Sequence, residues 1–210
     1  MARYTGASCR LCRAEGQKLF LKGSRCYSGK CAISRHSNTP GQHGHSKKKS
    51  SEYGLQLRAK QKARRYYGVL EKQFEHYYDF AEHIKEGKAG ENLLAILESR
   101  LDNVIYRLGW GNSRAQARQF LVHGKFKING KKVNIPSFRV RLGDLISVSE
   151  KGRNSESLKF IIDSNALRAC PKWIERVGNE NFEAKIIDKP KREDIDLEVE
   201  EALIIELYSK

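Results

Sequence analysis

Four cysteines determine how the first 50 residues of this 210-residue chain can fold. Cys9-x2-Cys12 is followed by thirteen residues and then by Cys26-x4-Cys31. Residues 1–50 show neither helical nor strand periodicity, and they are rich in Gly, Ser, Lys and Arg, so they cannot bury a core alone. Two close cysteine pairs joined by a short loop are typical of a structural zinc site. The spacing therefore predicts one Zn²⁺ that orders this segment.

Two other states of the four cysteines stay open, free thiols and a disulfide pair. Basic neighbours Arg10, Arg13, Arg25 and Lys30 favour the thiolate that zinc requires. Four thiolates would complete the tetrahedral shell, so the predicted metal has no open position for catalysis. Arg3 and its basic neighbours are not followed by an apolar stretch, and we therefore expect no secretory signal and a reducing compartment.

The positive charge is concentrated in the first third of the chain. The formal net charge is +15, and residues 1–70 hold 16 Lys and Arg against 2 acids. Residues 103–143 hold nine Lys and Arg and no acid, whereas the last 22 residues hold seven acids and four bases. Basic surfaces bind polyanions because neutralised phosphates release counterions, so we predict nucleic acid rather than an anionic membrane as the partner. No apolar run approaches the roughly 20 residues of a membrane helix.

Helical periodicity predicts four helices before residue 125. The first spans 51–67, is capped by Ser51 and ends at Gly68. The second and third span about 71–86 and 91–108, and the fourth starts at Asn112 or Ser113 and stops at Gly124. The third of the four carries the strongest apolar stripe. The predicted apolar face of the first helix comprises Leu55, Ala59, Ala63 and Tyr66.

Strand chemistry follows the fourth helix. Residues 125–128 alternate in polarity, Asn129-Gly130 is a strong hairpin turn, and 131–133 begin the return strand. Another strand is predicted at 145–148 and a short helix near 155–163. The tail, 197–208, fits either a helix or a strand.

Basic side chains on these elements are the candidate RNA contacts. One set lies in the first third of the chain and would hold phosphates at an RNA junction, and the other lies on the hairpin module and would hold a second RNA helix. The first set comprises Arg3, Arg10, Arg13, Lys47, Lys48, Lys49, Arg58, Lys60, Lys62, Arg64 and Arg65. The second comprises Arg114, Arg118, Lys125, Lys127, Lys131, Lys132 and Arg139.

Long segments of the chain resemble a known family. RLDNVIYRLG (100–109), SRAQARQ (113–119), VHG (122–124) and INGKKVNIPS (128–137) look like the RNA-binding domain of the bacterial small-subunit ribosomal protein S-four family. PGQHG (40–44), SEYGLQL (51–57), KQKARRYYGVLEKQF (60–74) and ELYSK (206–210) resemble its N-terminal domain and terminus. The four cysteines match the zinc-bearing form of the family.

The resemblance implies an α+β fold with two domains. The first would be mostly helical, with a zinc-bound segment at 1–45 and helices at 46–92 completed by 178–210. The second, 93–177, would be an inserted α/β-hairpin domain whose helix-helix-hairpin-strand module covers about 98–160.

The resemblance also implies a function. Family members bind the 5′ domain of 16S rRNA directly, nucleate assembly of the 30S body, and contribute to translational accuracy where mRNA enters the subunit. The expected partners are this rRNA, neighbouring small-subunit proteins, mRNA, and the protein's own message. The expected location is the ribosome in a bacterial cytoplasm, with no membrane.

Three other functions fit the sequence less well than the ribosomal role. An RNA-modifying enzyme would need a catalytic domain, and the sequence contains neither a phosphate-binding loop nor a GxSxG motif. A stand-alone factor that visits stalled ribosomes would lack the cysteine segment and the first-domain helices. A zinc-finger DNA binder would need a recognition helix at a suitable spacing after the cysteines, and none is predicted.

Overall fold

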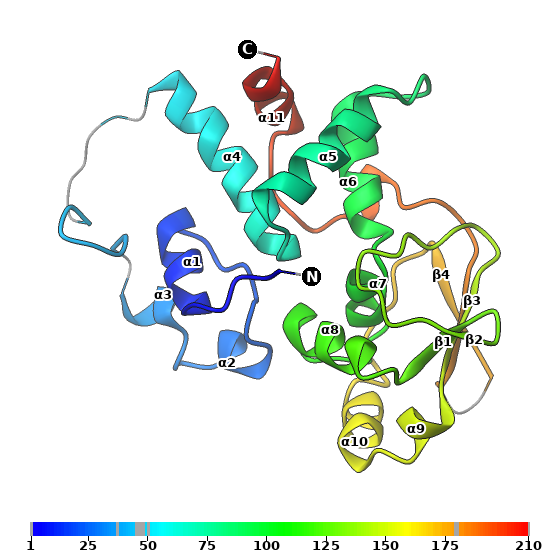
Figure 1. The fold of residues 1–210 in the computed structure, drawn as a ribbon. Helices are drawn as coiled ribbons and strands as arrows, with labels where there is room; N and C mark the ends of the chain where they lie inside the picture. The colour runs from blue at the N-terminus through cyan, green and yellow to red at the C-terminus, as the bar shows by residue number, and fades with distance from the viewer. Residues whose placement is uncertain (1, 37, 45–48, 50, 179–180, 210) are drawn as a thin grey trace. The chain divides into compact units, whose positions relative to one another are not determined.

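A computed structural model describes residues 2–36, 38–44, 49, 51–178 and 181–209 (Figure 1). The chain forms two compact units, residues 1–93 with 196–210, and residues 94–195. Within the described residues no helix is long and apolar enough to cross a membrane.

The first unit begins with three short helices that periodicity did not predict. They are α1 (Ser8–Glu15), α2 (Ser24–Tyr27) and α3 (Ala32–Arg35). The first has 8 residues and the other two have 4 each. Helices of this length are too short to produce an apolar stripe in the sequence. Leu19 and three of the cysteines are buried among them, so this segment has only a small core.

The long helices of the first unit follow the sequence prediction closely. In α4 (Glu52–Tyr67) the Ser51 hydroxyl accepts a hydrogen bond from the Gly54 N–H, and Gly68 ends the helix in the left-handed conformation. The next helix, α5 (Glu71–Glu82), is one turn shorter than predicted. One part of the predicted face of α4 is wrong, since Leu55 is half exposed and Gln56 is buried.

The C-terminal tail returns to the first unit as a helix, α11 (Glu201–Tyr208), which packs on α4 (Figure 1). The buried Gln56 amide donates to the Glu206 carboxylate at 3.0 Å, which explains why a polar residue occupies this position. The Tyr208 ring stacks on Tyr78 of α5, with ring centroids 4.4 Å apart. The tail, for which the sequence left helix and strand open, is therefore helical and closes the first core.

The second unit packs helices against one antiparallel sheet. The sheet order is β2-β1-β3-β5-β4. Its helices lie before, between and after the strands in the chain, and the boundary between the two units falls within α6. The helices are α6 (Ala89–Glu98), α7 (Leu101–Arg107), α8 (Arg114–Val122), α9 (Glu150–Arg153), α10 (Glu156–Ser164) and the 3-10 turn η1 (Arg192–Asp194). The strands are β1 (Phe126–Ile128), β2 (Lys131–Lys132), β3 (Leu145–Val148), β4 (Ile174–Val177) and β5 (Glu183–Ile186).

The core of this unit lies between α7, α8, α10 and the sheet. Trp110 and Phe126 stack with ring centroids 5.6 Å apart, and both are fully buried. The hairpin turn is as predicted, since Asn129 and Gly130 both have positive φ, as a type I′ turn requires.

Two predictions differ from the structure. The helix expected at 91–108 is interrupted at Ser99 and Arg100, because the backbone there bonds to residues 138–140 instead. The Val140 N–H donates to the Ser99 carbonyl at 2.9 Å, and the Leu101 N–H donates to the Phe138 carbonyl at 2.8 Å. Residues 178–195, assigned to the first domain, lie in the second unit, because β5 pairs with both β3 and β4.

Candidate nucleic-acid interface

The basic face of α4 is neutralised in part by two carboxylates. Glu15, at the end of α1, pairs with Arg65 and with Arg58, the latter at 3.4 Å. Its side chain is 2 % exposed, and burial raises its pKa, although the two guanidinium groups oppose this rise. These contacts fasten the cysteine segment to α4, so Arg65 and Arg58 hold the first unit together as well as adding positive charge.

The second carboxylate of this face is Glu71, at the start of α5. Its oxygens lie 2.6 Å from Lys60 Nζ and 3.2 Å from an Arg64 guanidinium nitrogen. Glu71 is nearly half exposed, whereas Lys60 and Arg64 are more covered. Glu71 therefore holds this pair of cations in place and neutralises part of their charge.

The remaining first-set candidates differ in exposure. Arg3, Arg10 and Lys49 are exposed, and Lys62 is half-buried. Arg13 donates its Nε–H to the Asn38 carbonyl at 3.0 Å. Lys47 and Lys48 lie outside the described residues.

On the hairpin module, three predicted contacts are at the surface. Lys131 and Lys132 form the short edge strand β2, and both are exposed, as is Arg139. Lys127 on β1 is half-buried, with its Nζ 3.8 Å from a Glu150 carboxylate oxygen. The edge strand presents two exposed cations, one on each face because successive strand residues alternate, and neither pairs with a carboxylate within the described residues.

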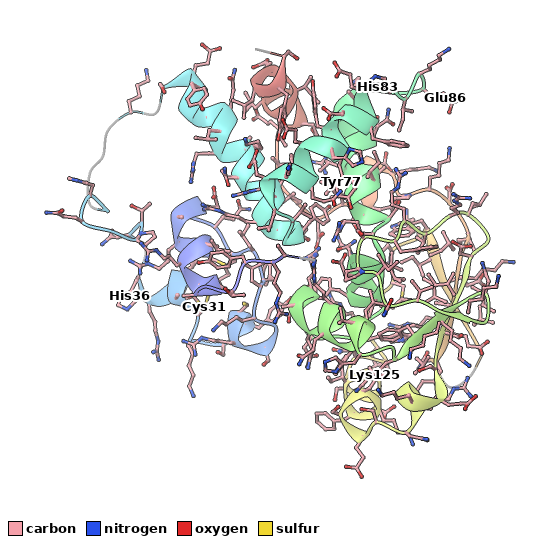
Figure 2. The ribbon with its side chains drawn as sticks, in the orientation of Figure 1. Cys31, His36, Tyr77, His83, Glu86 and Lys125 are labelled. Atoms are coloured by element: carbon pink, nitrogen blue, oxygen red, sulfur yellow. The ribbon has the colours of Figure 1, made fainter. Side chains whose placement is uncertain are left out.

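Two predicted contacts of the hairpin module are buried instead. Lys125 donates to the Ser155 hydroxyl at 2.6 Å, and its ammonium lies 4.4 Å from the Phe120 ring centroid (Figure 2). Burial, with the nearby Lys151 charge, lowers the pKa of Lys125. Arg114 is buried too, donating to the Asn103 amide oxygen at 2.8 Å. Both side chains fix the module rather than cover its surface.

A buried polar network, absent from the sequence prediction, links these helices. The Glu98 carboxylate accepts from Arg107 at 2.6 Å and from the Asn103 amide at 2.6 Å. The Asp102 carboxylate accepts from Arg100 at 2.8 Å and pairs with Arg118 at 3.3 Å. Arg118 therefore has two roles. It pairs with the buried Asp102, and because it is only half-buried it also adds positive charge at the surface.

The structure adds exposed cations that the prediction omitted. Lys22, Arg25, Lys30 and Arg35 are all exposed in the cysteine segment. They could have been found from the sequence, because residues 16–51 contain no Asp or Glu that could neutralise them.

The four paired cysteines lie in this same segment. Cys12, Cys26 and Cys31 are buried, and Cys9 is half-buried (Figure 2 labels Cys31). Burial raises the pKa of Cys12, and the nearby thiols of Cys26, Cys9 and Cys31 add to the rise. Cys26 Sγ accepts a hydrogen bond from the Lys22 N–H at 3.3 Å, a contact that also suits a metal-bound thiolate.

The predicted zinc site is not confirmed. Among the residues that the structure describes, no three His, Cys, Asp or Glu side chains are gathered closely enough to hold a metal ion. The donor chemistry fits zinc, because all four side chains are thiols and belong to one short segment, but their sulfur atoms are not placed as a ligand set.

Comparisons with known proteins cover the whole chain. Residues 3–98 match the family described as ribosomal protein S4/S9 N-terminal domain, and residues 99–146 match the S4 domain. The chain is 61 % identical over 211 residues to the small ribosomal subunit protein uS4 of Clostridium tetani, with all of both chains covered. It is 60 % identical, again over the full length of both, to uS4 of Clostridium botulinum and uS4A of Clostridium acetobutylicum.

Proposed function

The chain belongs to the family of the small ribosomal subunit protein uS4, and on this premise we propose that each of its two units holds a different rRNA helix. Members of this family are structural, rRNA-binding components of the small ribosomal subunit and not enzymes, so the chain is a ribosome-bound protein. Two units that bind separate helices of one RNA would restrict the angle between those helices, which is how binding can organise assembly.

The observation that carries the proposal is the acid-free run 103–143. This run includes the hairpin module. Its exposed cations are Lys131 and Lys132 on the edge strand, and Arg139, which forms a β-bridge with Arg100. The contact surface of the first unit comprises Lys60, Arg64 and the exposed Arg3, Arg10 and Lys49. We exclude Lys125 and Arg114 from the surface because both are buried.

The finer role follows from the family resemblance. We infer binding to the 5′ domain of 16S rRNA, nucleation of the 30S body, contacts with neighbouring small-subunit proteins, and an influence on accuracy where mRNA enters. Binding to the protein's own message is part of the same inference, because one RNA-binding surface can serve both. The rival role, a stand-alone factor at stalled ribosomes, is disfavoured by the full-length first unit with its cysteine segment.

Sucrose-gradient fractionation of a cell lysate at high salt tests the proposal. We expect the chain in the 30S and 70S fractions at about one copy per small subunit, because the rest of a large folded protein–RNA interface holds it after salt has weakened the phosphate contacts. Release into the light fractions, or migration with the 50S peak alone, would assign the chain to a transient factor instead.

We also propose that Cys9, Cys12, Cys26 and Cys31 hold one structural Zn²⁺. The support is their spacing, the burial of three of the four, and the small core around them, which leaves the segment few apolar contacts to stabilise it. Bound zinc would cross-link the pairs and contribute to the folding free energy of this segment.

Metal analysis of protein purified under reducing conditions tests this site. We expect about one equivalent of zinc, because four thiolates satisfy one tetrahedral ion. The Cys26→Ser variant should lose the metal, whereas Cys170→Ser should keep it, since Cys170 lies in the second unit. Metal-free protein with all four cysteines intact and reduced would exclude the site.

A further inference from the structure

A stacked pair of aromatic rings, one exposed and one half-buried, lies in the cysteine segment. The rings of Phe20 and Tyr27 are stacked, with centroids 5.1 Å apart and planes at 27°. Tyr27 is 71 % exposed, although it directly follows the buried Cys26. A ring with this exposure can be reached by a ligand, and the stacking with Phe20 restrains its orientation.

The loop that carries these rings is held firmly. Phe20 has φ of 51°, a left-handed conformation that is rare for a bulky side chain and persists only where the surroundings impose it. Leu19 beside it is fully buried, and the Lys22 N–H donates to Cys26 Sγ at 3.3 Å. The backbone on both sides of the ring pair is therefore anchored, which preorganises the stack.

The chemistry around the rings favours an RNA ligand. Lys18, Lys22, Arg25 and Lys30 each lie within three residues of one ring or the other, and residues 16–51 contain no acid. A nucleobase can stack on an aromatic face while its own phosphate contacts a nearby cation, and such platforms bind unpaired bases. An apolar protein partner would use the rings but would leave these cations unmatched.

We propose that the Phe20–Tyr27 pair is a stacking platform for one unpaired base of the bound rRNA. The proposal rests on the proposed function and adds a contact that does not depend on charge neutralisation. Phe160 on α10 provides the contrast: it is also 71 % exposed, but Glu156 and Asp163 lie on the same short helix, and no ring is stacked on it in the described residues.

Salt-dependent binding to a 16S rRNA 5′-domain fragment tests the platform in the full chain. The Tyr27→Leu variant keeps an apolar side chain but loses the ring, and we expect affinity to fall about fivefold to a hundredfold at every salt concentration. The slope of affinity against salt should stay unchanged because no phosphate contact is lost. Tyr27→Phe should restore binding, and Phe160→Leu should have no effect.

The outcomes separate the two proposals. If Tyr27→Leu binds like the wild type while Lys131→Ala with Lys132→Ala lowers the slope, the platform is wrong and the rRNA-binding role stands. If the wild type itself shows no salt-dependent preference for this RNA, both fail. Equal hydrogen exchange over residues 8–35 in wild type and variant would exclude unfolding as the cause of a loss.

A second readout does not require Tyr27→Leu to fold. The Tyr27→Trp variant places a fluorophore at the platform, whereas the native Trp110 and Trp173 are both buried. Stacking of a base should quench the added fluorescence on RNA binding. Unchanged fluorescence at saturating RNA would overturn the proposal.

Discussion

At the scale of single residues, charge in the sequence does not reveal which cations reach solvent. Lys125, Lys131 and Lys132 look equivalent along the hairpin, yet Lys125 points to Ser155 and the other two are exposed. The distinction depends on residues 149–155, which bond to Lys125 from elsewhere in the chain and which no local pattern encodes. The sequence therefore located the basic residues of the module but did not reveal which of them are exposed.

The hairpin lysines provide a direct prediction. Replacing the two exposed residues, Lys131→Ala with Lys132→Ala, should lower the salt slope of RNA binding by about 1.4–1.8, because two phosphate contacts are lost. The Lys125→Met variant should leave that slope unchanged and change the free energy of unfolding by about 1 kcal/mol or less. Filter binding at several salt concentrations measures the first quantity and urea titration the second. An equal loss of slope in both variants would contradict the assignment.

Lys125 also predicts a pH dependence. Burial lowers its pKa in the folded protein below the usual 10.5, so near that pH the unfolded chain binds more protons. Stability should therefore rise as the pH increases through the window just below 10.5, as far as this residue contributes. Urea titrations at a series of pH values should show this rise reduced in Lys125→Met, and an identical pH profile would argue against a buried ammonium.

Glu98 predicts a large effect from a small change. Its carboxylate is fully buried and accepts from both Arg107 and Asn103, so Glu98→Gln leaves a buried guanidinium without its counter-charge. We expect the free energy of unfolding of the second unit to fall by about 3–5 kcal/mol. The control Glu91→Gln, whose exposed partner Lys88 lies 3.8 Å away, should cost less than about 0.5 kcal/mol. Similar losses in both variants would show that the buried network contributes little.

At the scale of elements, local signals predict helices whose ends are set locally. Ser51 and Gly68 fixed α4 in advance, and Ser113 did the same for α8, because caps satisfy backbone groups within a few residues. The break between α6 and α7 was not predictable in this way. The apolar stripe of residues 91–108 is continuous. The helix is interrupted because the backbone groups of Ser99 and Leu101 form hydrogen bonds with residues 138–140.

The hairpin turn tests how much one local signal contributes. Gly130 has φ of 78°, and no atom lies within 4 Å of where a Cβ would be. Gly130→Ala therefore adds backbone strain without a clash, and we expect a loss of about 1–2 kcal/mol in the free energy of unfolding. Gly143→Ala is a matched case, with φ of 87° and equally open space. Urea titration that shows no loss for either variant would contradict this strain argument.

At the scale of the whole molecule, the sequence indicated two units but misplaced their boundary. Residues 174–186 carry mixed charge and no clear alternation, so β4 and β5 were missed, and with them the larger part of the sheet. These strands form because β3 offers β5 an edge, which is a long-range pairing that a local pattern cannot reveal. The charge asymmetry, by contrast, is a property of the whole chain and was readable directly.

Two units with separate cores should unfold separately, and tryptophan fluorescence can follow one of them alone. Both tryptophans, Trp110 and Trp173, are buried in the second unit, whereas Tyr208 closes the first core against Tyr78. Tyr208→Ala should destabilise the first unit by about 3 kcal/mol. In urea, the far-UV circular dichroism transition should then shift in part, while the tryptophan fluorescence transition stays where it is. If the fluorescence transition moves by the same amount, the two units unfold as one cooperative whole, because a substitution in the first core would then also lower the stability reported by the tryptophans of the second.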